Sequence, residues 1–148
     1  MELKKLEDLF YLENSHLLEV LDKDKAGSWT SDKTRGYGVV VCSYQDLRFG
    51  IPLRSRINHK FCFLTKDDKG LDFSKSVLLL KDEYISVKPF IIPADERNLL
   101  LSKSHFILGR FSHYVERYVF GWAKADKNIL RDYRYTTLVN YHSELGLK

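Results

Sequence analysis

The sequence lacks the short motifs that identify most nucleotide-binding proteins, zinc enzymes and esterases. Its 148 residues contain no Gly-rich phosphate loop, dinucleotide fingerprint, HExxH, paired CxxC or GxSxG segment. Acidic residues are scattered, and Asp67, Asp68 and Asp72 do not have the spacing of a calcium loop. These absences disfavour a metal-dependent nuclease, and we expect neither a metal site nor a cofactor.

Cysteine and long apolar runs are equally scarce. Cys42 and Cys62 are the only cysteines, each in an apolar strand-like run, so we expect buried, reduced thiols rather than a disulfide framework or a metal site. No apolar run approaches the roughly 18 residues that a membrane span requires. We therefore expect a cytoplasmic protein that does not associate with membranes.

What the sequence does contain is typical of one globular domain over residues 1–148. Hydrophobic residues make up 44% and charged residues 30% of a chain that is long enough for one core. The formal net charge of +4 favours an anionic partner such as nucleic acid. Aromatic residues, at 14%, are suited to filling a β-rich core and also to stacking on bases.

Short strands and a single long helix are predicted from the pattern of apolar residues. Residues 6–12 are compatible with a strand or a short helix, and residues 22–36 are predicted to form a polar loop. Strand-like runs follow at residues 37–42, 47–53, 60–64, 76–80 and 84–87, and residues 67–70 are predicted to form a turn. Apolar residues at helical spacing predict one long helix near residues 95–120, covering the sheet. The fold class expected is α+β, with a small curved antiparallel sheet or barrel, and residues 122–148 show no clear period.

A polar, basic segment follows the second predicted strand. It brings together a hydroxyl, an imidazole and three cations, in the order Arg54, Ser55, Arg56, His59 and Lys60. Arginine donates bidentate hydrogen bonds to phosphate oxygens, and histidine titrates near neutral pH. Cleavage of RNA without a metal needs a base, a cationic clamp and an acid, and this segment holds candidates for all three. A solvated strand end with a structural histidine is the alternative interpretation.

Further cations border the predicted elements. They are Lys33, Arg35, Lys75, Lys103, Arg110 and Arg117. The first two end the polar loop, and Lys75 adjoins a strand. The last three recur every seventh residue, so they share the helix face away from the apolar stripe. Phosphate binding fits this basic ridge, and so does ordinary solvation.

Five features stand in a fixed order within residues 6–122. They are Tyr-Gly-Val-Val-Val at 37–41, Ile-Pro-Leu-Arg-Ser at 51–55, His59, Gly-Leu-Asp-Phe-Ser-Lys at 70–75 and the helix at 96–118. Taken together they resemble the ToxN/TenpN (AbiQ-like) toxins of type III toxin–antitoxin systems. The resemblance implies a compact, strongly curved sheet similar to the barrel of the Kid/MazF ribonucleases. It also implies a metal-independent endoribonuclease that leaves a 2′,3′-cyclic phosphate and acts in phage defence or plasmid maintenance.

The same resemblance implies RNA partners. Toxins of this family are inhibited by a repeated, pseudoknotted antitoxin RNA, which the toxin processes from a precursor and binds in a closed, ring-like assembly. By this likeness the chain is expected to bind a cognate antitoxin RNA in a protein–RNA hetero-oligomer, and to cut cellular or phage RNA.

Ser55 matches the serine of the family's active-site segment, which reads Leu-Thr-Ser-Pro-Lys. In this chain Arg54, Arg56 and Ile57 stand where that segment has Thr, Pro and Lys. The lysine's role is therefore not reproduced at that spot, and the resemblance leaves Arg54, Arg56 or Lys60 as its substitute.

The remaining roles also follow from the resemblance. The family's basic residue before the first core strand falls near Lys33 and Arg35, with Thr34 in direct register. Charge stabilisation is accordingly assigned to Arg35 or Lys33, phosphate contact or proton transfer to Ser55, and acid–base work to His59. Two alternatives remain open: a non-catalytic RNA-binding protein, and a protein-interaction module whose binding would be insensitive to salt.

Overall fold

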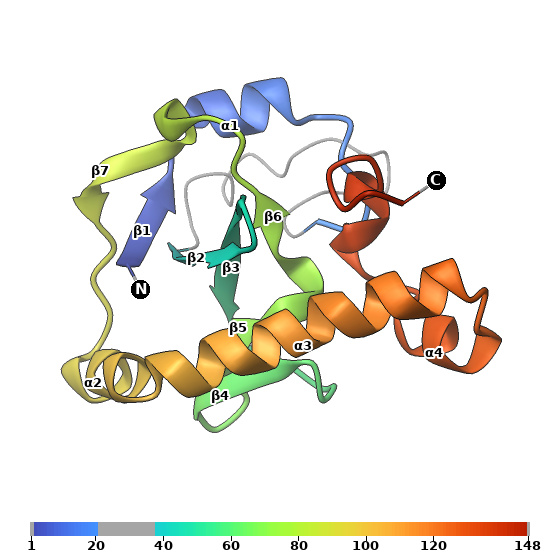
Figure 1. The fold of residues 1–148 in the computed structure, drawn as a ribbon. Helices are drawn as coiled ribbons and strands as arrows, with labels where there is room; N and C mark the ends of the chain where they lie inside the picture. The colour runs from blue at the N-terminus through green and yellow to red at the C-terminus, as the bar shows by residue number, and fades with distance from the viewer. Residues whose placement is uncertain (1, 21–37, 148) are drawn as a thin grey trace.

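The structure, a computed structural model, describes residues 2–20 and 38–147, in which seven strands form one antiparallel sheet (Figure 1). Lys33 and Arg35 lie outside the described residues. The strands are β1 Glu2–Leu6, β2 Gly38–Tyr44, β3 Leu47–Arg54, β4 Cys62–Lys66, β5 Lys69–Asp72, β6 Val77–Leu78 and β7 Ile85–Pro89. The helices are α1 Asp8–Glu13, α2 Ala94–Ser102, α3 Ser104–Ala123 and α4 Lys127–Asp132, with 3-10 turns η1 Phe73–Lys75, η2 Asp82–Tyr84 and η3 Thr137–Tyr141.

The sheet is open rather than closed into a barrel. Its strand order is β4-β5-β3-β2-β1-β7, with β6 paired to β3, so β4 and β7 are its two ends. The chain leaves β7 and enters α2, which contacts β4, and Thr65 of β4 donates a hydrogen bond of 2.8 Å to Glu96 of α2. A helix thus occupies the place where the end strands would have to pair. The α+β class is confirmed, whereas the predicted barrel is not formed among the described residues and a Kid/MazF-like fold is not confirmed.

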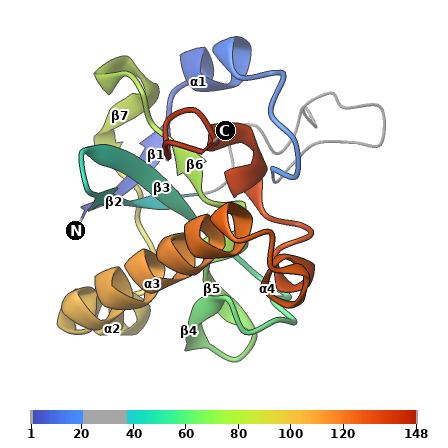
Figure 2. The same ribbon diagram turned by 45° about the vertical axis from the view of Figure 1, so that its right-hand side comes forward.

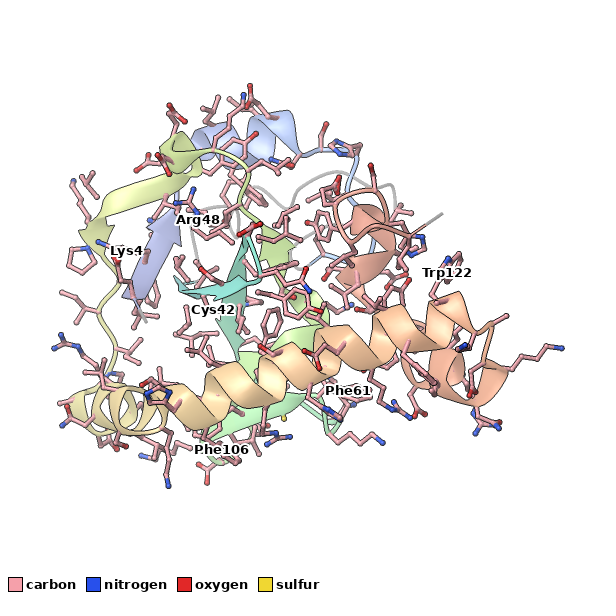
Figure 3. The ribbon with its side chains drawn as sticks, viewed as in Figure 1. Lys4, Cys42, Arg48, Phe61, Phe106 and Trp122 are labelled. Carbon is pink, nitrogen blue, oxygen red and sulfur yellow. The ribbon has the colours of Figure 1, made fainter. Side chains whose placement is uncertain are left out.

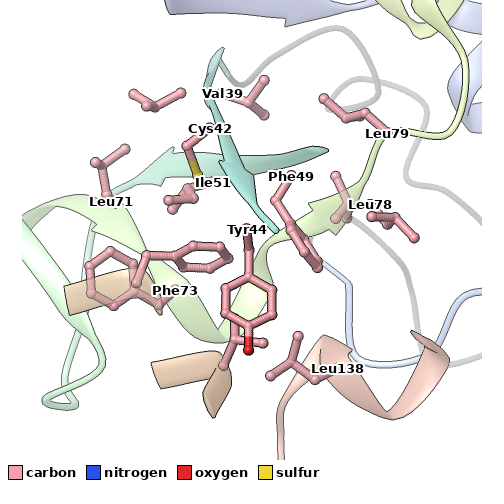
Figure 4. Close-up of a cluster of buried hydrophobic side chains, with 14 of the residues drawn as sticks. Val39, Cys42, Tyr44, Phe49, Ile51, Leu71, Phe73, Leu78, Leu79 and Leu138 are labelled. Atoms are coloured by element: carbon pink, nitrogen blue, oxygen red, sulfur yellow. The ribbon is translucent and has the colours of Figure 1, made fainter. Parts of the chain in front are cut away.

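Helix α3 carries the apolar stripe that its sequence predicts. The stripe consists of Ile107, Phe111, Tyr114, Val115 and Tyr118, all buried. The Phe111 ring packs edge-on against Phe49 of β3 at 5.4 Å and against Phe73 at 5.7 Å between centroids. Figure 4 shows part of the resulting core, where side chains of β2, β3 and η1 gather. Burial of such large aromatic side chains is the main source of stability in a domain of this size.

The prediction of a single helix near residues 95–120 is wrong in one respect. Helix α2 ends at Ser102 and α3 begins at Ser104, because Lys103 leaves the helical region with φ −106° and ψ 16°. The two helices bury different surfaces: α2 contacts the end strand β4, whereas α3 contacts β2 and runs past β5 (Figures 1 and 2). A straight helix would not reach both surfaces.

Several predicted strands shift or shorten in the structure. The strand predicted at 60–64 is β4, two residues later, and the one predicted at 76–80 shrinks to the two residues of β6. Residues 67–70, predicted to be a turn, supply only a two-residue turn, after which β5 begins at Lys69. Residues 6–12 end strand β1 and form helix α1. Both cysteines are buried and free, as expected. In the described part of the chain, no helix is long and apolar enough to cross a membrane.

Candidate functional site

A fully buried carboxylate, Asp72, organises the most polar cluster in the fold. Its Oδ1 accepts hydrogen bonds from the Ser74 backbone N–H at 3.0 Å and the Ser74 hydroxyl at 2.6 Å. The same oxygen lies 3.1 Å from His59 Nε2, and Oδ2 lies 3.1 Å from Arg54 Nη1. The Asp72 side chain is 0% exposed, so these partners replace water as the groups that stabilise its charge. We call Arg54, His59, Asp72 and Ser74 the Asp72 cluster.

The pairing of β3 with β5 brings the cluster together. Leu53 pairs with Leu71, and Arg54 pairs with Gly70, which places the end of β3 beside Asp72. Gly70 is needed there, because a Cβ at this position would lie 2.1 Å from the Phe63 carbonyl oxygen on β4. After Asp72 the chain turns into η1, and the Asp72 side chain caps this turn by accepting a hydrogen bond from the Ser74 backbone N–H.

Hydrogen bonding determines which nitrogen of His59 carries the proton. The Phe61 backbone N–H donates to His59 Nδ1 at 3.1 Å, so that nitrogen acts as an acceptor. The proton of the neutral ring is therefore on Nε2, from which it is donated to Asp72. A second proton on Nδ1 would point at the Phe61 N–H. In this arrangement neither ring nitrogen is free to accept a proton from a substrate.

His59 and Ser74 line a cavity of about 480 Å³, here called the His59 cavity. Its cationic side chains are Lys60, Arg131 and Arg134, and its aromatic ones include Phe61, Tyr133 and Tyr135. The Phe61 and Tyr133 rings stack with centroids 5.1 Å apart and planes inclined by 27°. The walls thus combine positive charge with aromatic faces beside a polar cluster, a composition that suits single-stranded nucleic acid.

Ser55 lies elsewhere. It is exposed just after β3 and lines a smaller cavity of about 210 Å³, together with Arg54, Lys69 and Glu96. Arg54 connects this cavity to the Asp72 cluster, because its Nε donates to the Ser55 carbonyl at 3.3 Å while its Nη1 binds Asp72. The structure therefore places the predicted residues Ser55 and His59 on different cavities, on either side of Asp72.

Two other predicted phosphate-binding cations, Arg56 after β3 and Lys75 in η1, differ in exposure. Arg56 is exposed and has a positive φ of 59°. The Lys75 side chain is only 16% exposed, and its Nζ donates to the Tyr135 carbonyl at 3.0 Å and lies 3.7 Å from Glu19. Burial lowers the pKa of Lys75, although Glu19 opposes this shift. Lys75 therefore holds a wall of the His59 cavity in this structure.

The predicted basic ridge is not continuous, because Arg110 and Arg117 lie on α3 whereas Lys103 belongs to neither helix. Lys103 is exposed at the junction of α2 and α3 and is absent from the walls of the cavities named here. Arg110 and Arg117 line a third cavity of about 590 Å³ along α3, here called the α3 cavity. It adjoins the His59 cavity, since Lys60, Phe61, Tyr114 and Tyr133 belong to both. The side chains of Phe61 and Phe106 lie along this edge of α3 in Figure 3.

Sequence reasoning missed the acidic and the C-terminal members of the site. Asp72 and Ser74 lie in the Gly-Leu-Asp-Phe-Ser-Lys segment at 70–75, where only Lys75 was given a role, and Arg131 and Arg134 lie in the segment that showed no period. Alternation of arginine with tyrosine at 131–135 was the one available signal, because it puts cations beside aromatic rings. It does not reveal which surface these residues face.

The charges around both cavities are unequally paired. Asp132 lies 3.1 Å from Arg117 and 4.0 Å from Lys60. Among the residues that the structure describes, Arg110, Arg131 and Arg134 have no carboxylate within 4.0 Å. These three guanidinium groups therefore keep most of their charge available to an anionic ligand.

The function of the site is indicated neither by a group of metal-binding side chains among the described residues nor by similarity to a known protein. Within residues 2–20 and 38–147, no group of three or more His, Cys, Asp or Glu side chains is arranged to hold a metal ion. No protein-family model, curated protein or solved structure matches the chain.

Proposed function

We propose that this protein is an endoribonuclease toxin of a type III toxin–antitoxin system, which cleaves RNA without a metal and is inhibited by a repeated pseudoknot RNA. The observation that carries the proposed RNA chemistry is the His59 cavity, where a buried carboxylate orders His59 and Ser74 beside cationic and aromatic walls. The toxin role rests on the order of segments that resembles the ToxN/TenpN family.

The proposed reaction is a transesterification within the RNA chain. The 2′-oxygen attacks the adjacent phosphorus and forms a 2′-O–P bond, while the P–O5′ bond breaks. The 2′-hydroxyl proton passes to a base, and an acid supplies a proton to the departing O5′. The non-bridging oxygens gain negative charge in the transition state and need cationic hydrogen-bond donors. The products are a 2′,3′-cyclic phosphate and a free 5′-hydroxyl.

Several side chains are placed to bind phosphate. The two hydrogen bonds of Arg54 use Nε and Nη1, so its Nη2 is the end left for a phosphate oxygen. Lys60, Arg131 and Arg134 present their charges to the His59 cavity. Ser55 is exposed beside Arg54, where its hydroxyl can donate to the same phosphate. Lys33 and Arg35 keep the charge-stabilising role that the resemblance gives them.

Proton transfer is the demanding part of the reaction for this site. Burial raises the pKa of Tyr133 to about 12, so its hydroxyl stays protonated near neutral pH and is no base. For His59 to act as a base, it has to release either the Phe61 N–H or Asp72 when RNA binds. This double engagement is also the observation that favours the second candidate function, an RNA-binding protein that does not cut its ligand.

The deciding experiment is to incubate the purified protein with total RNA in excess EDTA and to map new RNA ends. Ser55→Ala tests the exposed hydroxyl next to Arg54, Ser74→Ala tests the hydroxyl that donates to Asp72, and Ser143→Ala, an exposed serine on the C-terminal segment, is the matched control. We expect cuts that end in 2′,3′-cyclic phosphates, lost in Ser55→Ala and retained in the control.

Other results lead to different conclusions. Full cutting by Ser55→Ala would remove that residue from the mechanism. RNA that stays intact while binding persists would favour the RNA-binding protein. The toxin role is tested separately, by asking whether a tandem-repeat RNA encoded next to the gene suppresses growth arrest when both are expressed.

A further inference from the structure

The α3 cavity has an unusual floor. His105, Gly109, His113 and Arg117 follow one another every fourth residue, so they form a continuous row along α3, and all four line the cavity. Its volume of about 590 Å³ lies in the range of sites that hold small organic ligands. The proposed cleavage chemistry uses none of these four residues.

Gly109 in this row has no packing reason to be glycine. Glycine inside a helix is destabilising relative to alanine, and α3 extends for 20 residues. A Cβ built at Gly109 would meet nothing within 4 Å. At Gly121 in the same helix, by contrast, a Cβ would lie 2.5 Å from the Ile129 side chain. What the glycine at 109 provides is open space in the cavity floor.

The cavity walls are aromatic, and their edges are cationic. Phe61, Phe73, Phe106 and Tyr133 face it, and Phe106, whose ring lies 6.1 Å from that of Phe63, remains 54% exposed. The Arg110 guanidinium lies 5.9 Å from the Phe73 ring and 5.7 Å from the Phe106 ring, so it remains at the rim. A ligand with a flat ring can stack on the aromatic walls, and an anionic group on the same ligand can pair with the cationic rim.

We propose that the α3 cavity binds one base of a single-stranded RNA, adjacent to the phosphate at the Asp72 cluster. Aromatic rings stack on the base, and Arg110 and Lys60 bind the neighbouring phosphates. His105 and His113 offer ring nitrogens to the base edges, so this cavity selects which nucleotide lies beside the cut. The identification of the ligand as RNA rests on the proposed function.

The site differs from a docking groove for a protein helix in its charge. An apolar helix seated there would cover the Arg110 guanidinium without neutralising its charge, because its hydrogen-bond partner in the described structure is the Lys60 carbonyl oxygen, at 3.3 Å, and not a carboxylate. A nucleotide brings its own phosphate to that position, and a positive rim also steers an RNA chain toward the cavity.

The test compares two kinds of non-cleavable ligand of equal charge: 2′-O-methyl hexanucleotides of uridine or of adenosine, and a hexamer of the same backbone without bases. Affinities are measured by fluorescence anisotropy. Gly109→Leu fills the cavity while raising helix propensity, and Ala123→Leu, exposed near the end of α3, is the matched control. Phe106→Ala, which removes an exposed wall, is a second variant that leaves the core intact.

We expect Gly109→Leu and Phe106→Ala to bind the base-containing hexamers about tenfold more weakly than the wild type, which is the usual scale for loss of one base stack. Affinity for the abasic hexamer and all affinities of the control should be unchanged. The proposal is overturned if Gly109→Leu binds the base-containing hexamers as tightly as the wild type, or weakens both ligands equally. Cleavage of total RNA in EDTA is measured independently, so a nuclease whose α3 cavity ignores bases is distinguishable from a protein that cuts no RNA.

Discussion

Replacing Asp72 by asparagine should destabilise the fold strongly, although the two side chains have the same shape. The carboxylate accepts four close contacts, three on Oδ1 and one on Oδ2, and has no exposure to water. Asparagine supplies only one acceptor oxygen. If the side-chain NH2 group of the asparagine faces Arg54, two hydrogen-bond donors point at each other. If the NH2 group instead takes the place of Oδ1, the Ser74 N–H and the His59 ring lose their hydrogen-bond acceptor.

The magnitude follows from these contacts. A buried donor left without a partner costs about 1–3 kcal/mol, and breaking a buried ion pair costs about 3–5 kcal/mol. Arg54 and His59 are each 31% exposed and recover part of their hydration, so the lower part of these ranges applies. We expect a loss of about 3 kcal/mol in the free energy of unfolding. For a chain of this length that corresponds to roughly 6–12 °C in Tm.

Chemical denaturation of the wild type and of Asp72→Asn measures this loss directly. Asp68→Asn, an exposed aspartate in the turn between β4 and β5, is the matched control and should change stability by less than about 0.5 kcal/mol. A loss below about 1 kcal/mol for Asp72→Asn would refute the view that this carboxylate holds the cluster together.

Two further predictions concern pH. Burial lowers the pKa of His142, whose ring centroid lies 4.3 Å from that of Trp122. In a Trp29→Phe variant, the protonated His142 ring should therefore quench the Trp122 fluorescence with a midpoint below pH 6.5, and stability should fall as the pH drops below 6.5. A midpoint at or above pH 6.5 would contradict this. Hydrogen bonds from Lys81 and Tyr84 lower the pKa of Glu13, so its stabilising effect is complete above pH 4.5 and is lost as pH falls toward the lowered pKa. Thermal unfolding of Glu13→Gln should therefore depend less steeply on pH in that acidic range than that of the wild type.

Local periodicity was enough to predict the central hairpin and the buried face of α3. The β-branched residues before Tyr44 pair with β3 in an unbroken register from Val39–Pro52 to Tyr44–Leu47. A period of two or of 3.6 is set by residues that are close in sequence, so the pattern alone reveals it. The break at Lys103 was not predictable in this way, since apolar residues continue on both sides and only the different surfaces under α2 and α3 separate them.

The Asp72 cluster depends on information that a single sequence does not display. Its members come from the end of β3, from the connection to β4 and from η1, and they meet only because β5 pairs with both β3 and β4. Strand β5 was interpreted as part of a turn. Once that strand is missed, no spacing along the chain indicates that His59 and Asp72 are 3.1 Å apart.

The C-terminal segment is positioned by hydrogen bonds to distant residues rather than by a pattern of its own. The Tyr133 hydroxyl donates to the Tyr114 carbonyl at 2.7 Å, Tyr114 and Thr136 share a hydrogen bond of 2.6 Å, and the Thr137 hydroxyl donates to the Ser76 carbonyl. Such contacts bring Arg131 and Arg134 to the His59 cavity, although helix α4 has no buried residue that would have marked a face.

The number of Lys and Arg residues in the sequence also overestimates the positive charge that is available to bind RNA. Arg54 is bound to Asp72, Arg117 to Asp132, and Lys75 to Glu19 and a carbonyl oxygen, so these three stabilise the protein itself. Arg110, Arg131 and Arg134, which have no carboxylate within 4.0 Å among the described residues, border the two adjoining cavities. A net charge of +4 is modest for a nucleic-acid-binding protein. Because three unpaired guanidinium groups lie beside aromatic walls, the local positive field there is stronger than the net charge suggests, and RNA binding should weaken with added salt.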